Sequence, residues 1–138
     1  MFILQSRYTR GIFSHSTALY LHKLSDRVPL IYDMTFPARY NAHRLDKSLI
    51  KPRFDRRDIY GLFQQDVTTL QNRTVRAYKI ERTLCDILRP NANVDQALIS
   101  DAYKRWADKP DRNVYELSRC AQMLGVEEKV RSYLEVLL

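Results

Sequence analysis

The arrangement of apolar and polar residues changes character near residue 79 of the 138-residue chain. Before that point, short stretches rich in strand-forming residues follow one early helix. We expect a strand over residues 31–36, where apolar and polar residues alternate, and another over 74–78. Residues 59–70 suit one or two further strands. The short basic run 52–57 suits an edge strand, because it combines a proline with charged side chains.

The helices expected in this first part are short. Ser14 is a suitable N-cap for a helix over residues 15–24, whose apolar side chains cover one broad face. Residues 2–8 resemble the middle or end of a helix, because no capping residue precedes them. Residues 43–50 suit one or two helical turns, and a hairpin turn is expected at residues 72–73.

After residue 79 the apolar spacing predicts four packed helices. They cover roughly residues 81–88, 94–107, 114–124 and 126–138, and Gly125 suits the position that ends the third helix. A run of strands followed by a run of helices is typical of an α+β protein. We therefore expect one domain over residues 1–138, with a small, mostly antiparallel sheet packed against a C-terminal cluster of about four helices.

Positive charge is concentrated in residues 1–57, which hold eleven basic and four acidic side chains. This difference equals the whole formal net charge of +7, since residues 58–138 hold twelve of each kind. A one-sided distribution of charge steers an acidic partner toward one region. Tyr40, Phe54 and Tyr60 are interleaved with the cations of this region. The candidate residues for binding nucleic acid or another acidic partner are Arg39, Arg44, Lys47, Lys51, Arg53, Arg56 and Arg57.

Arginine side chains bind phosphate bidentately and can also pair with carboxylates, so this segment suits a DNA backbone or an acidic protein surface. No recognition helix or zinc-finger pattern accompanies the segment, and base-specific reading is therefore not supported. A charged and solvated sheet edge without a binding role is the alternative interpretation.

Catalytic chemistry has little support in the sequence. His15 and His22 are seven residues apart and cannot reach one zinc ion together, and three scattered glycines do not make a phosphate-binding loop. A metal-dependent nuclease or nucleotidyltransferase would need converging carboxylates, for which Asp55 and Asp58 are the candidates. Neighbouring arginines would instead neutralise both. We therefore expect no enzyme activity, no metal and no cofactor.

Cys85 and Cys120 lie in separate apolar segments, so buried free thiols in a reducing cytosol are expected. The chain has no apolar run of the roughly 18 residues that a membrane helix needs, and its first residues do not form a signal peptide. We expect a cytoplasmic protein without membrane contact.

Five stretches of the chain together resemble one protein family. They are residues 11–22, 24–29, 32–37 with Tyr40 and Asn41, 78–86 and 130–136. In this order they are similar to the C-terminal domain of AbiEi-type antitoxins, which belong to bacterial abortive-infection, type IV toxin–antitoxin systems. The stretches 14–27 and 81–86 carry the most specific part of the resemblance.

The resemblance implies a non-enzymatic regulator that counteracts a nucleotidyltransferase-like toxin and represses its own operon by binding operator DNA. In this family, antitoxic function is assigned to the domain matched here. DNA is recognised mainly by an N-terminal winged helix-turn-helix domain, for which this chain has no matching residues. We therefore expect antitoxin-like regulation, possible partners being operator DNA and a cognate toxin. The alternatives are a sequence-independent nucleic-acid-binding module and the metal-dependent enzyme.

Within the matched motifs, Arg82 and Asp86 are four residues apart on a predicted helix. Residues at this spacing face each other across one helical turn. We expect the two side chains to pair with each other or to anchor the helix to the sheet.

Overall fold

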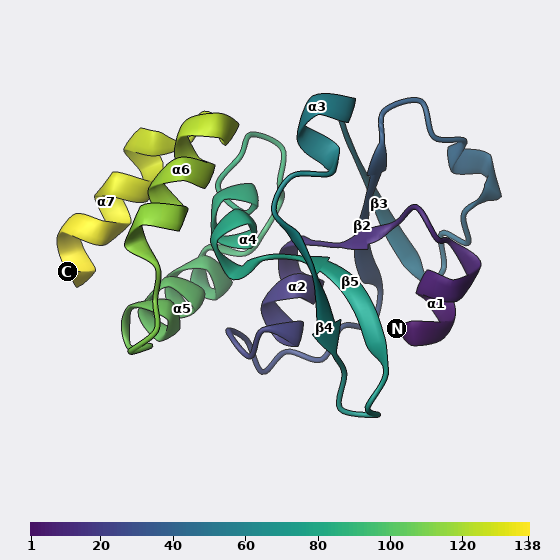
Figure 1. The fold of residues 1–138 in the computed structure, drawn as a ribbon, viewed down its shortest axis with the longest axis horizontal. Coiled ribbons are helices and arrows are strands. Elements are labelled where there is room, and N and C mark those ends of the chain that lie inside the picture. Colours follow the sequence, from purple (N-terminus) through teal and green to yellow (C-terminus); the bar gives the residue numbers. More distant parts are fainter.

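In the computed structural model, which describes residues 1–138, five strands form one mixed sheet in the order β3-β2-β1-β5-β4 (Figure 1). The strands are β1 (Ile12–Phe13), β2 (Tyr32–Pro37), β3 (Ile50–Asp55), β4 (Gln64–Thr68) and β5 (Thr74–Tyr78). β1 is antiparallel to β2 and parallel to β5, while β3 runs parallel to β2 and β4 runs antiparallel to β5. Two strand junctions are thus antiparallel and two are parallel.

The α+β class expected from the sequence is confirmed, and the sheet is mixed where we expected a mostly antiparallel one. The connections explain this pairing. A parallel neighbour requires a long crossover, and residues 38–49 provide it by carrying the chain from the end of β2 back to the start of β3, where Tyr32 lies opposite Ile50. The two-residue strand β1 joins both halves of the sheet, since Phe13 lies opposite Met34 on one side and Ala77 on the other.

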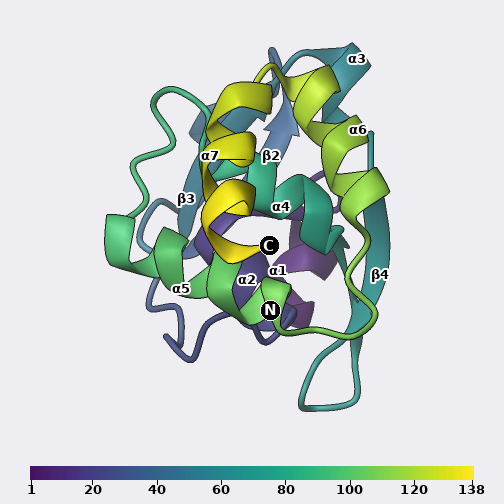
Figure 2. The same cartoon turned by 90° about the vertical axis from the view of Figure 1, so that its left-hand side faces the viewer.

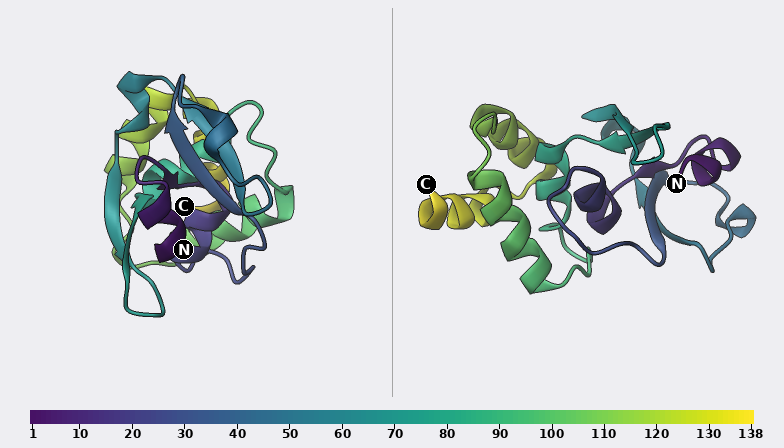
Figure 3. Two further views of the ribbon diagram at one scale, coloured as in Figure 1. Left: turned by 90° about the vertical axis from the view of Figure 1, so that its right-hand side faces the viewer. Right: turned by 90° about the horizontal axis from the view of Figure 1, so that it is seen from below.

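Helices occupy both ends of the chain. They are α1 (Phe2–Arg7), α2 (His15–Leu21), the 3-10 helix η1 (Ala42–Arg44), α3 (Arg57–Tyr60), α4 (Ile80–Asp86), α5 (Gln96–Ala107), α6 (Val114–Leu124) and α7 (Glu127–Leu137). The four helices predicted after residue 79 are therefore present. Helices α6 and α7 lie at one end of the molecule, and α1 with the 38–49 segment lies at the other (Figure 1 and Figure 3). Seen from the helical end, α5, α6 and α7 surround α4 (Figure 2).

Several local predictions can be compared directly with the structure. The basic run expected at an edge forms β3, which is the outermost strand on its side. Gly125 ends α6 with a left-handed backbone (φ 72°), as its position predicted. Residues 59–70 contain one strand, β4. The first two of these residues complete α3, and Phe63, directly before β4, holds a left-handed backbone (φ 59°). Of residues 43–50, only the first two are helical, within η1.

Two apolar clusters stabilise the packing of the helices and the sheet. The larger cluster lies in the helical half, where Leu84 of α4 is buried with Trp106 of α5 and Leu117 of α6. It also holds Cys85 and Cys120, which are buried free thiols as expected. The smaller cluster lies on the sheet face beside α1 and consists of Leu4, Tyr8, Phe13, Met34, Phe36, Leu45, Ile50, Val75 and Ala77. No helix of this fold combines the length and apolar character required to cross a lipid bilayer.

Candidate functional site

The sheet face that α2 and α4 cover is polar, although it lies inside the molecule. Alternate residues of a strand point to the same side. Met34 and Phe36 of β2 point toward α1, so Asp33 and Thr35 point toward α2. Polar groups in such a buried layer need hydrogen-bonding partners to avoid a large desolvation penalty. The layer is therefore built from paired side chains.

Arg82 of α4 is the centre of this layer, and its side chain has no exposed surface. Its guanidinium donates to Asp86 at 3.1 Å and to Asp55, the last residue of β3, at 2.7 Å. It also donates to the carbonyl oxygens of Ile59 and Leu62, at 2.5 and 2.9 Å. Both roles expected for Arg82 are thus confirmed, since it pairs across one helical turn and anchors α4 to the sheet.

Arg89 completes the network around these two carboxylates. Its guanidinium donates to both carboxylate oxygens of Asp55, at 2.9 and 3.0 Å, and to the second oxygen of Asp86 at 3.1 Å. Two arginines and two aspartates therefore share one closed set of ion pairs, in which the charges cancel. The Tyr78 ring lies against the Arg82 guanidinium, with 3.7 Å between the guanidinium carbon and the ring centroid.

A chain of hydroxyl groups connects α2 to the same layer. The Thr35 hydroxyl donates to the Ser14 Oγ at 2.8 Å, and the Ser14 Oγ lies 2.9 Å from Nδ1 of His15. The Ser14 hydroxyl has one proton to donate and two lone pairs that accept, so it can receive the Thr35 proton and also bond Nδ1, whose role as donor or acceptor depends on the His15 tautomer. Burial lowers the pKa of His15 well below its usual range, and the neighbouring guanidinium groups of Arg53 and Arg89 lower it further.

The predicted N-cap role of Ser14 is only partly realised. Ser14 does hold the extended backbone of an N-cap, but its side chain makes no capping hydrogen bond. Instead, its hydroxyl serves the interior chain with Thr35 and His15. The following residue, His15, adopts a left-handed backbone (φ 49°), which is uncommon for a residue other than glycine.

Arg53 occupies the interior layer rather than the surface predicted for it. Its guanidinium donates to Asp33 through Nη2 at 3.2 Å and through Nε at 3.3 Å, and only 13% of its side chain is exposed. Burial raises the pKa of Asp33, although the Arg53 guanidinium acts in the opposite direction. The strand alternation that points Phe54 outward turns Arg53 inward, so it cannot serve as a freely accessible binding residue.

The other six predicted binding residues are exposed and lie before, on and after the edge strand β3. We call them the basic edge: Arg39, Arg44, Lys47, Lys51, Arg56 and Arg57. Only Arg56 has an ion-pair partner, the exposed Asp58 at 3.4 Å. Across residues 1–57, the only basic side chains in ion pairs are Arg27, Arg53 and Arg56, so eight of the eleven are unpaired.

The two carboxylates considered for metal chemistry serve different partners. Asp55 accepts from Arg82 and Arg89 in the interior, whereas Asp58 is exposed and pairs with Arg56. No group of three or more histidine, cysteine, aspartate or glutamate side chains is arranged to hold a metal ion. Asp55 and Asp58 are therefore both engaged by arginines.

Aromatic side chains accompany the basic edge, as their interleaving in the sequence suggested. Tyr40 stacks on the buried Phe36, with ring centroids 4.5 Å apart and planes inclined by 26°. Phe54 lies opposite Phe36 on the neighbouring strand β3, with 6.4 Å between the two ring centroids, and it is 45% exposed. The Tyr60 hydroxyl donates to the carbonyl oxygen of Arg10. Burial raises the pKa of Tyr60, while the nearby Arg76 and Arg10 act against that shift.

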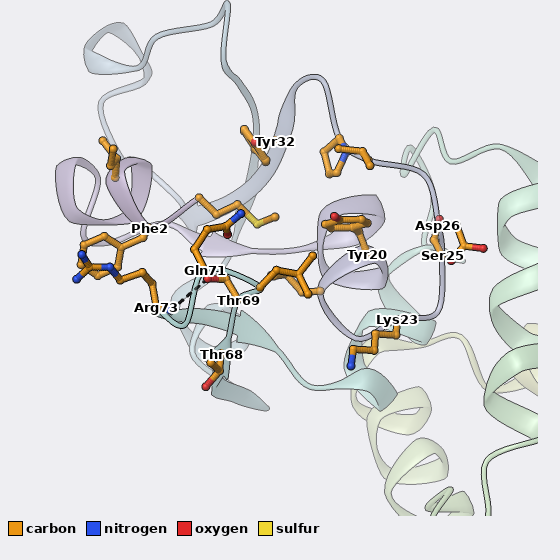
Figure 4. A pocket seen from close by; sticks show the side chains of 16 residues that line it. Phe2, Tyr20, Lys23, Ser25, Asp26, Tyr32, Thr68, Thr69, Gln71 and Arg73 are labelled. Carbon is orange, nitrogen blue, oxygen red and sulfur yellow. Dashed lines mark hydrogen bonds between the residues drawn. The ribbon is translucent and has the colours of Figure 1, made fainter.

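A separate hollow of about 740 Å³ lies between α1, α2, the loop after α2 and the β4–β5 hairpin (Figure 4). Its lining includes the apolar side chains of Val28 and Leu70, with Lys23 and Arg73 on opposite sides. The Arg73 guanidinium lies over the Phe2 ring, 5.0 Å from its centroid. No motif in the sequence predicted this hollow, because four distant segments contribute to it. Its volume lies within the range typical of small-ligand sites.

Comparisons with known proteins leave the family undetermined, since neither the protein-family models nor the curated proteins include a match to this chain.

Proposed function

We propose that this domain is a non-catalytic regulator of the antitoxin type, which acts by binding and presents the basic edge to an acidic partner. The observation that carries this proposal is the contrast between the interior and the edge. Inside, Arg82 and Arg89 neutralise Asp55 and Asp86. Outside, five of the six cations of the basic edge have no ion-pair partner. Unpaired surface cations produce a field that attracts polyanions.

The buried network supports a binding role over a catalytic one. A general acid or base must reach the substrate and exchange a proton with it. Arg82 has no exposed side-chain surface, Asp86 is 1% exposed, and Asp55 is held by two arginines. These groups fix the position of α4 against the sheet, and their charges cancel within the network.

The resemblance to AbiEi-type antitoxins agrees with this arrangement. Its two most specific stretches, residues 14–27 and 81–86, are far apart in the sequence but meet at the junction of α2, the sheet and α4. The first supplies Ser14 and His15, and the second supplies Arg82 and Asp86. Helices α2 and α4 pack against each other, which places the two motifs side by side. The motifs therefore specify the architecture that holds the basic edge.

The proposed partners are operator DNA and a nucleotidyltransferase-like toxin. The basic edge is formed by the 38–49 segment, an edge strand and the four-residue helix α3. These elements present cations to phosphate or carboxylate groups, whereas base-specific reading of a duplex commonly uses a longer helix in the major groove.

Co-expression tests the antitoxin proposal. We expect the wild-type chain to restore growth to cells that express the nucleotidyltransferase-like toxin encoded beside it. Charge reversal at Arg39, Arg44 and Lys47 should abolish that rescue. Charge reversal at Lys104, Arg112 and Arg131, three exposed cations of the helical half without ion pairs, is the matched control and should leave rescue intact. Failure of the wild-type chain to restore growth would refute the antitoxin proposal.

A second candidate is sequence-independent binding of nucleic acid, which the number of unpaired cations favours. The logarithm of such an affinity falls with the logarithm of salt concentration, with a slope of about −0.9 per phosphate contact on B-DNA. We expect several contacts and a correspondingly steep slope with unrelated sequences. A flat salt dependence would exclude this candidate without affecting the antitoxin proposal.

A further inference from the structure

We propose that the basic edge binds single-stranded nucleic acid, with bases stacked on the aromatic side chains at the end of β3 and phosphates held by the arginines beside them. This inference rests on the second candidate function above, sequence-independent binding of nucleic acid, and specifies its ligand. Proteins that bind single strands without sequence preference combine exposed aromatic rings with a cationic surface. Both features occur together here.

The ends of two parallel strands bring the aromatic rings together. β2 and β3 run in the same direction and end side by side, so that Phe36 lies opposite Phe54. Past these ends, the backbone N–H of Ala38 donates to the carbonyl oxygen of Asp55 at 2.7 Å. This bond holds the turn that carries Tyr40, which stacks on Phe36. The fully buried Phe36 is therefore the fixed base on which the more exposed rings rest.

Phe54 is the most suitable stacking residue of this group. Phe54 is 45% exposed, whereas the preceding residue, Arg53, points to the opposite side of the sheet and is held in the interior by Asp33. Because Phe54 belongs to a strand, its backbone is fixed on one side by β2. A base that stacks on this ring would cover apolar surface that now faces water, and little conformational freedom of the ring would be lost.

Arginines flank these rings in the sequence and at the surface. Arg39 directly precedes Tyr40, while Arg56 and Arg57 follow Phe54 by two and three residues. All three are exposed, and the single ion pair among them joins Arg56 to the exposed Asp58. Such exposed pairs contribute little energy, so all three guanidinium groups are available to phosphates. Each stacking position thus has a cation within one to three residues.

The same geometry favours a single strand over a duplex. In a duplex, the faces of the bases are covered by their neighbours, and only the base edges are accessible in the grooves. Exposed rings can stack only on bases whose faces are free, as in single-stranded DNA or RNA. An acidic protein would contact the arginines, but it would not require an exposed ring at Phe54.

Binding of fluorescent oligonucleotides tests this inference. The probes are oligothymidylate and oligouridylate of about 15 nucleotides, near the upper end of known site sizes, and a duplex of the same length. Phe54→Leu keeps an apolar side chain but removes the ring, and Phe54→Trp keeps a ring. Tyr115→Leu, at a 74% exposed aromatic residue of α6, is the matched control. Thermal unfolding of each variant verifies that the fold is retained.

We expect both single strands to bind more tightly than the duplex. Phe54→Leu should weaken single-strand binding by about 5- to 150-fold, the range that corresponds to the loss of one stacked base. Phe54→Trp should bind nearly as well as wild type, and Tyr115→Leu should have no effect. A preference for one single strand over the other would identify DNA or RNA as the ligand.

Three results would overturn the inference, and they differ in what else they affect. Equal binding by Phe54→Leu and wild type would exclude base stacking but leave phosphate binding at the basic edge in place. Tighter binding of the duplex would have the same consequence. Absence of binding to all three probes at low salt would remove the nucleic-acid candidate altogether, and the antitoxin proposal would then depend on a protein partner.

Discussion

Arg82 and Asp55 are 27 residues apart in the chain, yet their side chains meet at 2.7 Å inside the molecule. This contact joins the first helix of the C-terminal half to the last residue of the edge strand β3. Arg82 has no exposed side-chain surface, and Asp55 is 11% exposed. The pair therefore connects the two halves of the fold through charges that are largely shielded from water.

Removal of the Arg82 guanidinium should strongly destabilise the fold. Arg82→Ala leaves Asp86 buried and Asp55 deprived of one partner, and breaking a buried ion pair in this way costs about 3–5 kcal/mol. Arg82→Lys should recover only part of the loss, because an ammonium group cannot reproduce the forked contacts. Urea unfolding measures the change. Arg27→Ala, which breaks the exposed pair with Asp95, is the control and should leave the midpoint almost unchanged; an equal loss in both variants would contradict the role of Arg82.

Stability should decrease in mild acid because of His15. The folded protein keeps this side chain neutral, with its pKa lowered by burial and by nearby arginines, whereas the unfolded chain takes up a proton below about pH 6.5. The contribution of His15 is thus complete above about pH 6.5 and is lost as the pH falls toward the lower folded-state pKa. One such group gives a slope of at most about 1.4 kcal/mol per pH unit.

The His15 contribution can be separated from that of other titrating groups by substitution. His15→Asn does not titrate and tolerates the left-handed backbone at this position. As the pH falls from 7 toward 5, wild type should therefore lose unfolding free energy relative to His15→Asn. His22→Gln is a second variant, since burial also lowers the pKa of His22. A difference between wild type and His15→Asn that does not vary with pH would contradict a neutral His15.

Arg53 and Arg57, which are four residues apart, should respond differently to substitution by glutamine. Arg53→Gln removes the partner of Asp33, whose side chain is 8% exposed, and should lower the free energy of unfolding by about 2–3 kcal/mol. Arg57→Gln removes an unpaired surface cation. It should leave stability unchanged and reduce the salt slope of nucleic-acid binding by about 0.9. Paired urea and salt titrations of both variants are decisive, and identical profiles would mean that the interior position of Arg53 has no energetic consequence.

Gly11 should not tolerate a side chain. A Cβ added there would lie 2.5 Å from the Met34 Cε and 3.0 Å from the Phe36 Cζ. The methionine end can move, but the buried Phe36 ring also supports Tyr40. Gly11→Ala should therefore destabilise the protein by about 1–3 kcal/mol, as overpacking of a core does. At Gly61 the nearest atom would be the Gln64 Nε2 at 3.7 Å, so Gly61→Ala is the matched control for thermal unfolding.

The sequence was sufficient for features that depend on local spacing. The pairing of Arg82 with Asp86 followed from their separation by one helical turn, and the four C-terminal helices followed from apolar periodicity. β3 was recognisable as an edge strand, because proline and charged residues are tolerated there. These predictions required no knowledge of distant segments.

Features that depend on long-range contacts were not predictable in the same way. The charges of Asp55 and Arg89 gave no sign that both belong to one buried network with Arg82, because Asp55 is 27 residues from Arg82 and 34 from Arg89, and such separations leave their approach undetermined. The inward position of Arg53 depends on the register of β3, and a shift by one residue would have exposed it. The parallel pairing of β2 with β3 likewise depends on the path of residues 38–49.

The central strand β1 has a consequence for how the protein is made. Its parallel neighbour β5 is synthesised more than sixty residues after it, since Phe13 pairs with Ala77. Until then, the nascent chain carries an incomplete sheet with an open edge. Topologies that depend on such distant contacts fold slowly, and they expose apolar surface and unpaired strand edges until folding is complete. Completion of the sheet around β1 therefore has to wait for synthesis of β5.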